Sequence, residues 1–181
     1  DLTQASDVND YVASNDFDGI GSSKYPFAGV ISGDDATNKP TITLPGQDRK
    51  KVKVNYGLIQ YMKGAVVQNL NITTLAETAD SNKDDIYINS YAGGVAARVI
   101  GGDNIIDNVT VSTRLIANAT TTTMGGYVAI LEKGGLIIRN MEVLDVSNFN
   151  PVYKDANTDM KLKNQVSSVV GKVEDGYVLY E

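Results

Sequence analysis

Carboxylates are the residues of this sequence best suited to catalysis. The chain has no His and no Cys, which excludes imidazole acid–base catalysis, thiol nucleophiles and thiolate metal sites. Five carboxylates lie in or near repeated segments and could meet on neighbouring strands: Asp103, Asp107, Glu132, Glu142 and Asp145. Hydrolysis of a glycosidic bond requires two carboxyl groups about 5–10 Å apart. Because these five do not recur at equivalent positions, we predict solubilising surface charges and no catalytic residue.

Two acidic pairs, Asp34-Asp35 and Asp84-Asp85, raise the question of calcium binding. Carboxylate oxygens are preferred calcium ligands, but neither pair has the spaced D-x-D-x-D-G pattern of a calcium loop. We therefore predict solvated loops, with no metal site and no cofactor. Asp84, Asp85 and Asp103 remain candidate binding residues, because polar loops between repeats often carry ligand contacts.

Tyrosine is the abundant aromatic residue, with 10 Tyr against 3 Phe and no Trp. Five tyrosines fall near expected strand starts: Tyr56, Tyr61, Tyr87, Tyr91 and Tyr127. Exposed tyrosines could stack on sugar rings, whereas partial burial at the ends of an apolar core would explain the same positions. Tyr87, Tyr91 and Tyr127 are the candidate binding residues of this group.

The charge of the chain bears on its partners. The net charge is −6 and the pI about 4.6, and the one dense basic cluster is Arg49-Lys50-Lys51 with Lys53. We therefore predict no nucleic-acid partner. The sequence has no apolar run long enough to span a membrane and no signal peptide, so we predict no membrane insertion.

A repeat is present in the chain, although loops of unequal length interrupt it. Segments 66–72, 105–111 and 137–143 each have the pattern apolar, apolar, polar, Asn, apolar, polar, apolar. Their asparagines, Asn69, Asn108 and Asn140, follow one another at 39 and 32 residues. A glycine-containing strand precedes each segment, and residues 166–179 align with 125–138 at an offset of 41.

This period predicts an all-β fold in which the chain winds once around an axis per repeat. Each strand would pair in parallel with its copy in the next coil, as in a parallel β-helix or β-solenoid. Val67, Ile106 and Ile138 would stack in the core. Each Asn would occupy a corner, where it tolerates left-handed backbone and bonds to the Asn of the next coil.

Glycine doublets precede the second and third segments, at Gly93-Gly94 and Gly125-Gly126. No helix start follows them, which argues against a phosphate-binding loop. We predict that Gly94 and Gly126 have a structural role, allowing a tight corner or the close approach of two backbones.

We predict one domain over 1–181, with coils over 17–181 and an N-terminal cap over 1–16. Leu2, Val8 and Val12 have partial helical spacing, which favours a short capping helix. Because the chain begins at Asp1 without Met, we expect a segment of a longer protein.

Residues 27–33 (FAGVISG) resemble the opening of bacterial solenoids that carry the GLUG motif. The Gly-Gly strands at 93–97 and 125–129, each followed by an I-x-N-v-x-v segment, resemble the repeats of that family. The resemblance implies a right-handed parallel β-helix, similar to that of pectate lyases. It also implies a large exported protein, secreted or associated with the cell wall.

We therefore predict a non-catalytic, adhesin-like interaction or spacer module. Its expected partners are a host or environmental glycan or protein and other domains of the same parent chain. The alternative is a protein that binds or degrades polysaccharides.

Overall fold

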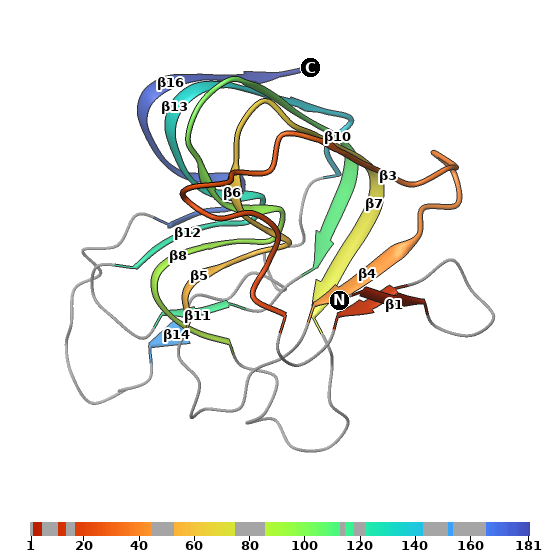
Figure 1. Cartoon of the computed structure of the whole chain (residues 1–181), viewed down its shortest axis with the longest axis horizontal. Coiled ribbons are helices and arrows are strands. Elements are labelled where there is room, and N and C mark those ends of the chain that lie inside the picture. The colour runs from red at the N-terminus through yellow and green to blue at the C-terminus, as the bar shows by residue number, and fades with distance from the viewer. Residues whose placement is uncertain are drawn as a thin grey trace.

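The computed structural model describes residues 2–4, 11–13, 17–44, 53–74, 86–112, 115–117, 122–142, 152–153 and 166–181. Throughout these ranges the regular structure consists of strands, with no helix, which confirms the predicted all-β class. Figure 1 shows the strands of successive segments lying on one another in a curled stack.

The described strands form two sheets. The larger has ten strands: β1 (Leu2–Gln4), β2 (Tyr11–Ala13), β3 (Val30–Ser32), β4 (Thr41–Leu44), β6 (Ile59–Met62), β7 (Val66–Thr74), β9 (Ala96–Val99), β10 (Asp103–Ser112), β13 (Val128–Arg139) and β16 (Val170–Tyr180). The smaller has six: β5 (Lys53–Tyr56), β8 (Ile86–Gly93), β11 (Leu115–Ala117), β12 (Thr123–Gly125), β14 (Val152–Tyr153) and β15 (Val166–Ser167). Among the described strands, every pairing except β1 with β2 is parallel. This arrangement is compatible with a parallel β-helix.

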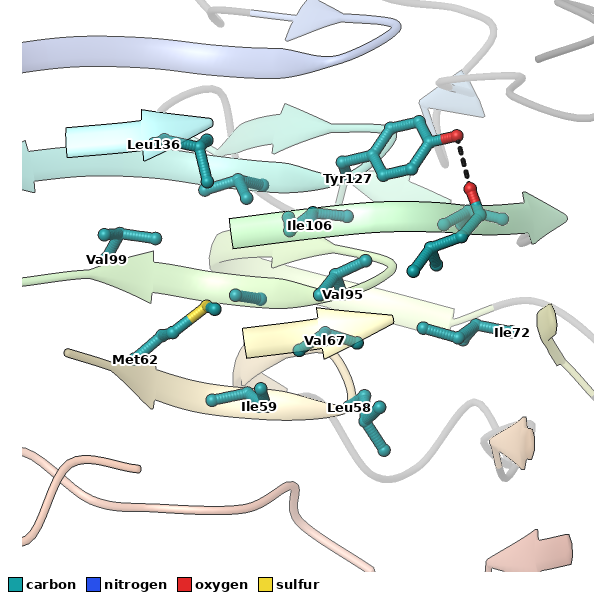
Figure 2. Close-up of a cluster of buried hydrophobic side chains, with 14 of the residues drawn as sticks. Leu58, Ile59, Met62, Val67, Ile72, Val95, Val99, Ile106, Tyr127 and Leu136 are labelled. Atoms are coloured by element: carbon teal, nitrogen blue, oxygen red, sulfur yellow. Dashed lines mark hydrogen bonds between the residues drawn. The ribbon is translucent and has the colours of Figure 1, made fainter. Parts of the chain in front are cut away.

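Equivalent apolar residues of the repeats are stacked in register. Ile106 pairs with Val67 on β7 and with Ile138 on β13, and all three are at most 1% exposed. Val109 pairs with Leu70 in the same way. Parallel strands are usually buried on the face that they share with the core, so this register produces one continuous apolar column (Figure 2).

The repeated asparagines adopt the left-handed backbone conformation. Their φ angles are 54° at Asn69, 52° at Asn108 and 47° at Asn140. Along β10 the buried side chains alternate up to Ile106 and resume at Val109, so two consecutive residues face away from the core. Asn is one of the few residues that accept this conformation at small energetic cost, which explains its place at this step.

Hydrogen bonds between these asparagines are partial. Nδ2 of Asn108 donates to Oδ1 of Asn69 at 3.0 Å. Asn140 instead donates from Nδ2 to Oδ1 of Asp107 at 2.9 Å. The asparagines of the first two repeats are therefore bonded to each other, whereas the Asn of the third repeat is bonded to a carboxylate, that of Asp107.

The glycine doublets lie where the two sheets meet and backbones approach closely. A Cβ atom at Gly94 would overlap the side chain of Val111 and lie 2.8 Å from the carbonyl oxygen of Gly126. The backbone N–H of Gly94 donates to that same oxygen at 3.0 Å, and the N–H of Gly126 donates to Ser167 at 3.1 Å. Hydrogen bonds between repeats thus continue through the connections between strands.

The N-terminal helix prediction is wrong. Leu2–Gln4 and Tyr11–Ala13 form two antiparallel strands, β1 and β2, and β2 then pairs in parallel with β4. The edge of β4 offers backbone N–H and C=O groups that a strand can satisfy and a helix cannot. Tyr11 and Val12 also favour strands by intrinsic propensity.

The predicted register of the last repeat is wrong by one residue. Gly125 pairs with Ser167 and Val128 with Val170, an offset of 42 rather than 41. Because side chains alternate along a strand, this shift decides which residues face the core. It places Val178 beside the buried Leu136 and moves Tyr177 beside Gly135.

Asn104 is a buried polar residue that the repeat pattern does not indicate. It is 0% exposed, whereas the equivalent positions in the other repeats hold Ala65, Leu136 and Val178. Its Oδ1 accepts the N–H of Ala65 at 3.1 Å. Its Nδ2 donates to the carbonyl oxygens of Gly101, Gly102 and Gly135 at 3.1, 3.1 and 3.0 Å. Asn104 therefore stabilises the turn that precedes β10.

Replacing Asn104 by Leu tests this role. Leu matches the residue of the next repeat but leaves the buried N–H of Ala65 without its acceptor, which costs about 1–3 kcal/mol. We expect Asn104→Leu to lower the free energy of unfolding in urea by that amount. Leu136→Ile, an apolar exchange at the equivalent position, is the control and should cost less than about 1.5 kcal/mol. Equal stability of wild type and Asn104→Leu would contradict the assigned role.

The left-handed conformation of Asn108 gives a second prediction. Ala lacks the tolerance for positive φ, whereas Gly retains it. Both substitutions lose the side-chain hydrogen bond to Asn69. The difference between their free energies of unfolding therefore reports the cost of the backbone conformation. We expect Asn108→Ala to be less stable than Asn108→Gly by about 1 kcal/mol in urea unfolding. The reverse order would show that the conformation imposes no strain at this position.

Candidate functional site

The carboxylates predicted to lie on the surface have separate hydrogen-bond partners. Asp103 accepts from the hydroxyl of Tyr177 at 3.0 Å, and Glu142 from the hydroxyl of Thr110 at 2.8 Å. Glu132 forms an ion pair with Arg98. Asp107 accepts from Asn140, as described above. Asp145, Asp84 and Asp85 lie outside the described residues.

The five tyrosines singled out in the sequence separate into core and surface residues. Tyr56 and Tyr127 are core residues, 3% and 0% exposed. The prediction of Tyr127 as a binding residue is therefore wrong, because its side chain is not accessible to a ligand. Its hydroxyl donates to the carbonyl oxygen of Val109 at 2.8 Å (Figure 2). The backbone of Tyr87 lies in β8, and its side chain is outside the described part. Tyr61 and Tyr91 are half-buried at the surface.

Asp103 lies in an open depression of about 560 Å³, which we call the Asp103 groove. Its polar side chains are Lys63, Asp103, Lys133, Asp175 and Tyr177. Its remaining lining includes Gly101, Gly102, Gly134 and Gly176.

These glycines cannot be replaced without moving the backbone. Gly102 and Gly134 have φ angles of 69° and 99°, and a Cβ at Gly102 would lie 2.7 Å from the backbone nitrogen of Gly64. Glycine is required at such positions because other residues rarely adopt this backbone conformation. Between the charged side chains, the groove is therefore lined by backbone.

The charges in the groove are of both signs. Lys133 and Asp175 are register partners on adjacent strands. Tyr177 is 47% exposed, and a Cβ at its register partner Gly135 would lie 2.7 Å from Oδ1 of Asp103. The hydrogen bond to Asp103 raises the pKa of Tyr177, which keeps its hydroxyl protonated as a donor. This arrangement can bind a polar ligand through both charges and one exposed aromatic ring.

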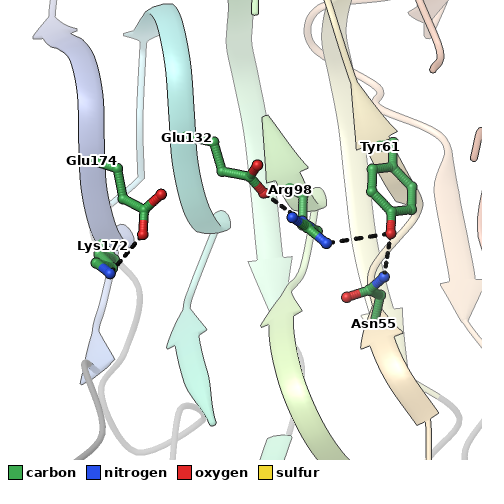
Figure 3. A network of polar contacts seen from close by, with 6 residues as sticks. All are labelled: Asn55, Tyr61, Arg98, Glu132, Lys172 and Glu174. Atoms are coloured by element: carbon green, nitrogen blue, oxygen red, sulfur yellow. Dashed lines mark hydrogen bonds and ion pairs between the residues drawn. The ribbon is translucent and has the colours of Figure 1, made fainter. Parts of the chain in front are cut away.

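A second polar cluster, which we call the Arg98 corner, comprises Asn55, Tyr61, Tyr91, Arg98 and Glu132. Figure 3 shows four of these residues on neighbouring strands, from Glu132 through Arg98 and Tyr61 to Asn55. The guanidinium carbon of Arg98 lies 5.1 Å from the ring centroid of Tyr61 and 4.9 Å from that of Tyr91. Both distances are within the range of cation–π attraction.

The electrostatics of the corner are dominated by Arg98. Its Nε donates to Glu132, and this hydrogen bond raises the pKa of the guanidinium. The side chains of Arg98 and Glu132 are 28% and 25% exposed, so solvent screens their attraction only in part.

Asn55 has an unusual hydrogen-bonding state. The residue is 8% exposed, and its Nδ2 donates to the hydroxyl of Tyr61 at 3.2 Å. Its Oδ1 is buried and has no hydrogen-bond partner within the described part of the chain. A buried acceptor left in this state costs about 1–3 kcal/mol, so it requires an explanation. Sequence reasoning missed Asn55 because it has no counterpart in the repeat pattern.

The Asp34-Asp35 pair lies in a loop, as predicted. Both residues are exposed, and Oδ1 of Asp35 accepts the backbone N–H of Thr37 at 2.7 Å. Backbone hydrogen bonds from Thr37 and Asn38 lower the pKa of Asp35. No group of three or more acidic residues in the described ranges is placed to hold a metal ion.

Comparisons with known proteins give no relative for this chain. No protein-family model matches it, and neither a curated protein nor a solved structure shows significant similarity. Within the described ranges, no helix has the length and apolarity needed to cross a membrane.

The burial of Tyr127 has a consequence at high pH. Burial, with a smaller contribution from the charge of Glu142, raises the pKa of Tyr127 to about 12. An unfolded tyrosine ionises near pH 10. The folded state therefore keeps a proton that the unfolded state releases, and the associated stability is complete below about pH 10 and lost as the pH rises towards 12.

We expect Tyr127→Phe to be less stable than wild type by about 1 kcal/mol at pH 8, because it loses the bond to Val109. This difference should shrink between pH 10 and 12, since Phe does not ionise. Urea unfolding at several pH values measures it. Tyr25→Phe, at a tyrosine that is 69% exposed, is the control and should follow wild type. A difference that stays constant up to pH 12 would contradict the assigned pKa.

Proposed function

We propose that this chain is a right-handed parallel β-helix module of an exported bacterial surface protein. The parallel register of equivalent residues in successive repeats supports the coil. The GLUG-like residues at 27–33 and the repeated Gly-Gly strands support the exported, cell-wall-associated class. The module has no catalytic role and acts in adhesion or as a spacer between domains.

The observation that carries the interaction role is the Asp103 groove. It combines an exposed aromatic ring with lysines and aspartates on a backbone-lined surface, which suits a hydroxyl-rich ligand such as a glycan. The side chains come from different repeats, so the stacked coil is what assembles them. The residues common to the repeats are engaged in folding, whereas the charged and aromatic side chains of the groove differ from one repeat to the next.

Glycan and protein arrays test the interaction role. We expect the module to bind a subset of glycans, and Tyr177→Ala to weaken that binding at least about tenfold through loss of the aromatic surface. Tyr25→Ala removes a tyrosine outside the groove that is more exposed than Tyr177, 69% against 47%, and should bind as wild type does. Circular dichroism of both variants establishes that they are folded. Absence of binding by wild type on every array would leave only the spacer role.

A polysaccharide-degrading enzyme is the second candidate function. Asp103 and Asp175 line the same groove, and glycoside hydrolysis needs two carboxyl groups on one substrate. Under the non-catalytic proposal, incubation with polysaccharides produces no reducing ends. Release of reducing ends by wild type, and its loss in Asp103→Asn or Asp175→Asn, would establish the enzyme instead.

A further inference from the structure

The Arg98 corner has hydrogen-bond donors that are not used within the protein. A guanidinium has five N–H donors. Nε of Arg98 donates to Glu132, and Nη1 is 3.4 Å from the hydroxyl oxygen of Tyr61. In the described part of the chain no other acceptor contacts Arg98, so the terminal nitrogens keep unused N–H groups. A planar pair of N–H groups of this kind suits a carboxylate.

Tyr61 provides a further donor beside Arg98. Its hydroxyl oxygen accepts from Nδ2 of Asn55 at 3.2 Å and from Nη1 of Arg98. Those two contacts use the oxygen as an acceptor, and its own proton has no acceptor among the described residues. A carboxylate in front of Arg98 would therefore receive hydrogen bonds from both a cation and a hydroxyl.

The buried oxygen of Asn55 defines the second half of the site. This oxygen needs a donor and has none in the described residues. An ammonium group would add a second positive charge near Arg98, which disfavours it as that donor. A hydroxyl group is neutral and meets the requirement. Tyr91 is the register partner of Asn55 on β8, and its half-buried ring lies 4.9 Å from the guanidinium carbon of Arg98, so it is the side chain that would turn aside to admit the hydroxyl.

We propose that the Arg98 corner binds a hydroxylated carboxylate. The carboxylate receives hydrogen bonds from the terminal nitrogens of Arg98 and from the Tyr61 hydroxyl. The ligand hydroxyl donates to Oδ1 of Asn55 once the Tyr91 ring has moved. The site has no residue in common with the Asp103 groove and does not depend on the β-helix or cell-surface proposals.

Three small compounds of equal carbon number separate the two halves of the site. D-glycerate has a carboxylate and hydroxyls, propionate has only the carboxylate, and glycerol has only hydroxyls. Each is titrated into the ¹⁵N-labelled full chain at constant ionic strength, and the side-chain N–H signals of Arg98 and Asn55 are followed by NMR. We expect saturable shifts with D-glycerate, binding weaker by about tenfold with propionate, and no saturation with glycerol.

Variants distinguish a binding site from a structural cluster. Arg98→Lys keeps the charge but loses the planar fork, and should weaken D-glycerate binding by about tenfold. Asn55→Leu removes the unpartnered oxygen, so we expect its melting temperature to equal or exceed that of wild type. The same variant should bind D-glycerate no better than propionate. Arg139→Gln is the control: Arg139 lies on the same sheet, paired with Glu181, and its loss should leave affinity unchanged within about twofold.

Three results would overturn the proposal. The first is equal affinity for D-glycerate and propionate, which would remove the role of Asn55. The second is unchanged D-glycerate affinity in a folded Arg98→Lys variant. The third is a response to D-glycerate confined to signals of the Asp103 groove, which would leave the interaction role of that groove standing and reject the Arg98 corner.

Discussion

Parallel pairing of each repeat with the next is the constraint on which the remaining structure depends. Once Ile106 lies between Val67 and Ile138, every neighbouring position along the three strands has a fixed partner and a fixed face. Apolar positions then form one core, and polar positions are brought together on the outside whether or not they are close in sequence. The Asp103 groove and the Arg98 corner both arise in this way, from residues of different repeats.

Local backbone conformation keeps that register at the points where the alternation of side chains is interrupted. Left-handed asparagines allow two consecutive residues to face outward before the core pattern resumes. Glycines at 102 and 134 allow backbones of adjacent repeats to approach more closely than a Cβ would permit. Asn104 adds the hydrogen bonds that the turn before β10 needs in a buried place. Each of these features helps to keep equivalent residues of successive repeats in register.

Much of the fold could be predicted from the sequence, because the repeat is marked by residue types that suit only certain conformations or environments. Asn69, Asn108 and Asn140 mark the step in the strand, and the apolar positions around them mark the core. The register of the last repeat was predicted one residue away from the observed one because Ser167 and Ser168 stand where the preceding repeat has its glycine doublet. The N-terminal strands were missed because their pairing depends on the edge of β4, which no local pattern reveals.

The candidate sites could be predicted only in part. Asp103 and Tyr91 were singled out as single residues, but their neighbours come from positions far away in the chain. Tyr127 was indistinguishable from Tyr91 by residue type, although one lies in the core and the other at the surface. No sequence pattern indicated Asn55, because its distinguishing feature is a buried oxygen without a hydrogen-bond partner, which only the packed structure shows.

The direction of the backbone hydrogen bonds between repeats has a mechanical consequence. These bonds run from one repeat to the next, so a force that pulls repeats apart acts along them and is shared among all the bonds of a pair of strands. The longest pairing, between β13 and β16, extends from Val128 to Ile138 and distributes such a load widely. The pairings of β2 with β4 and of β11 with β14 have only two residue pairs each and would yield before it. Under tension the stack would therefore lose these short pairings before β13 and β16 separate.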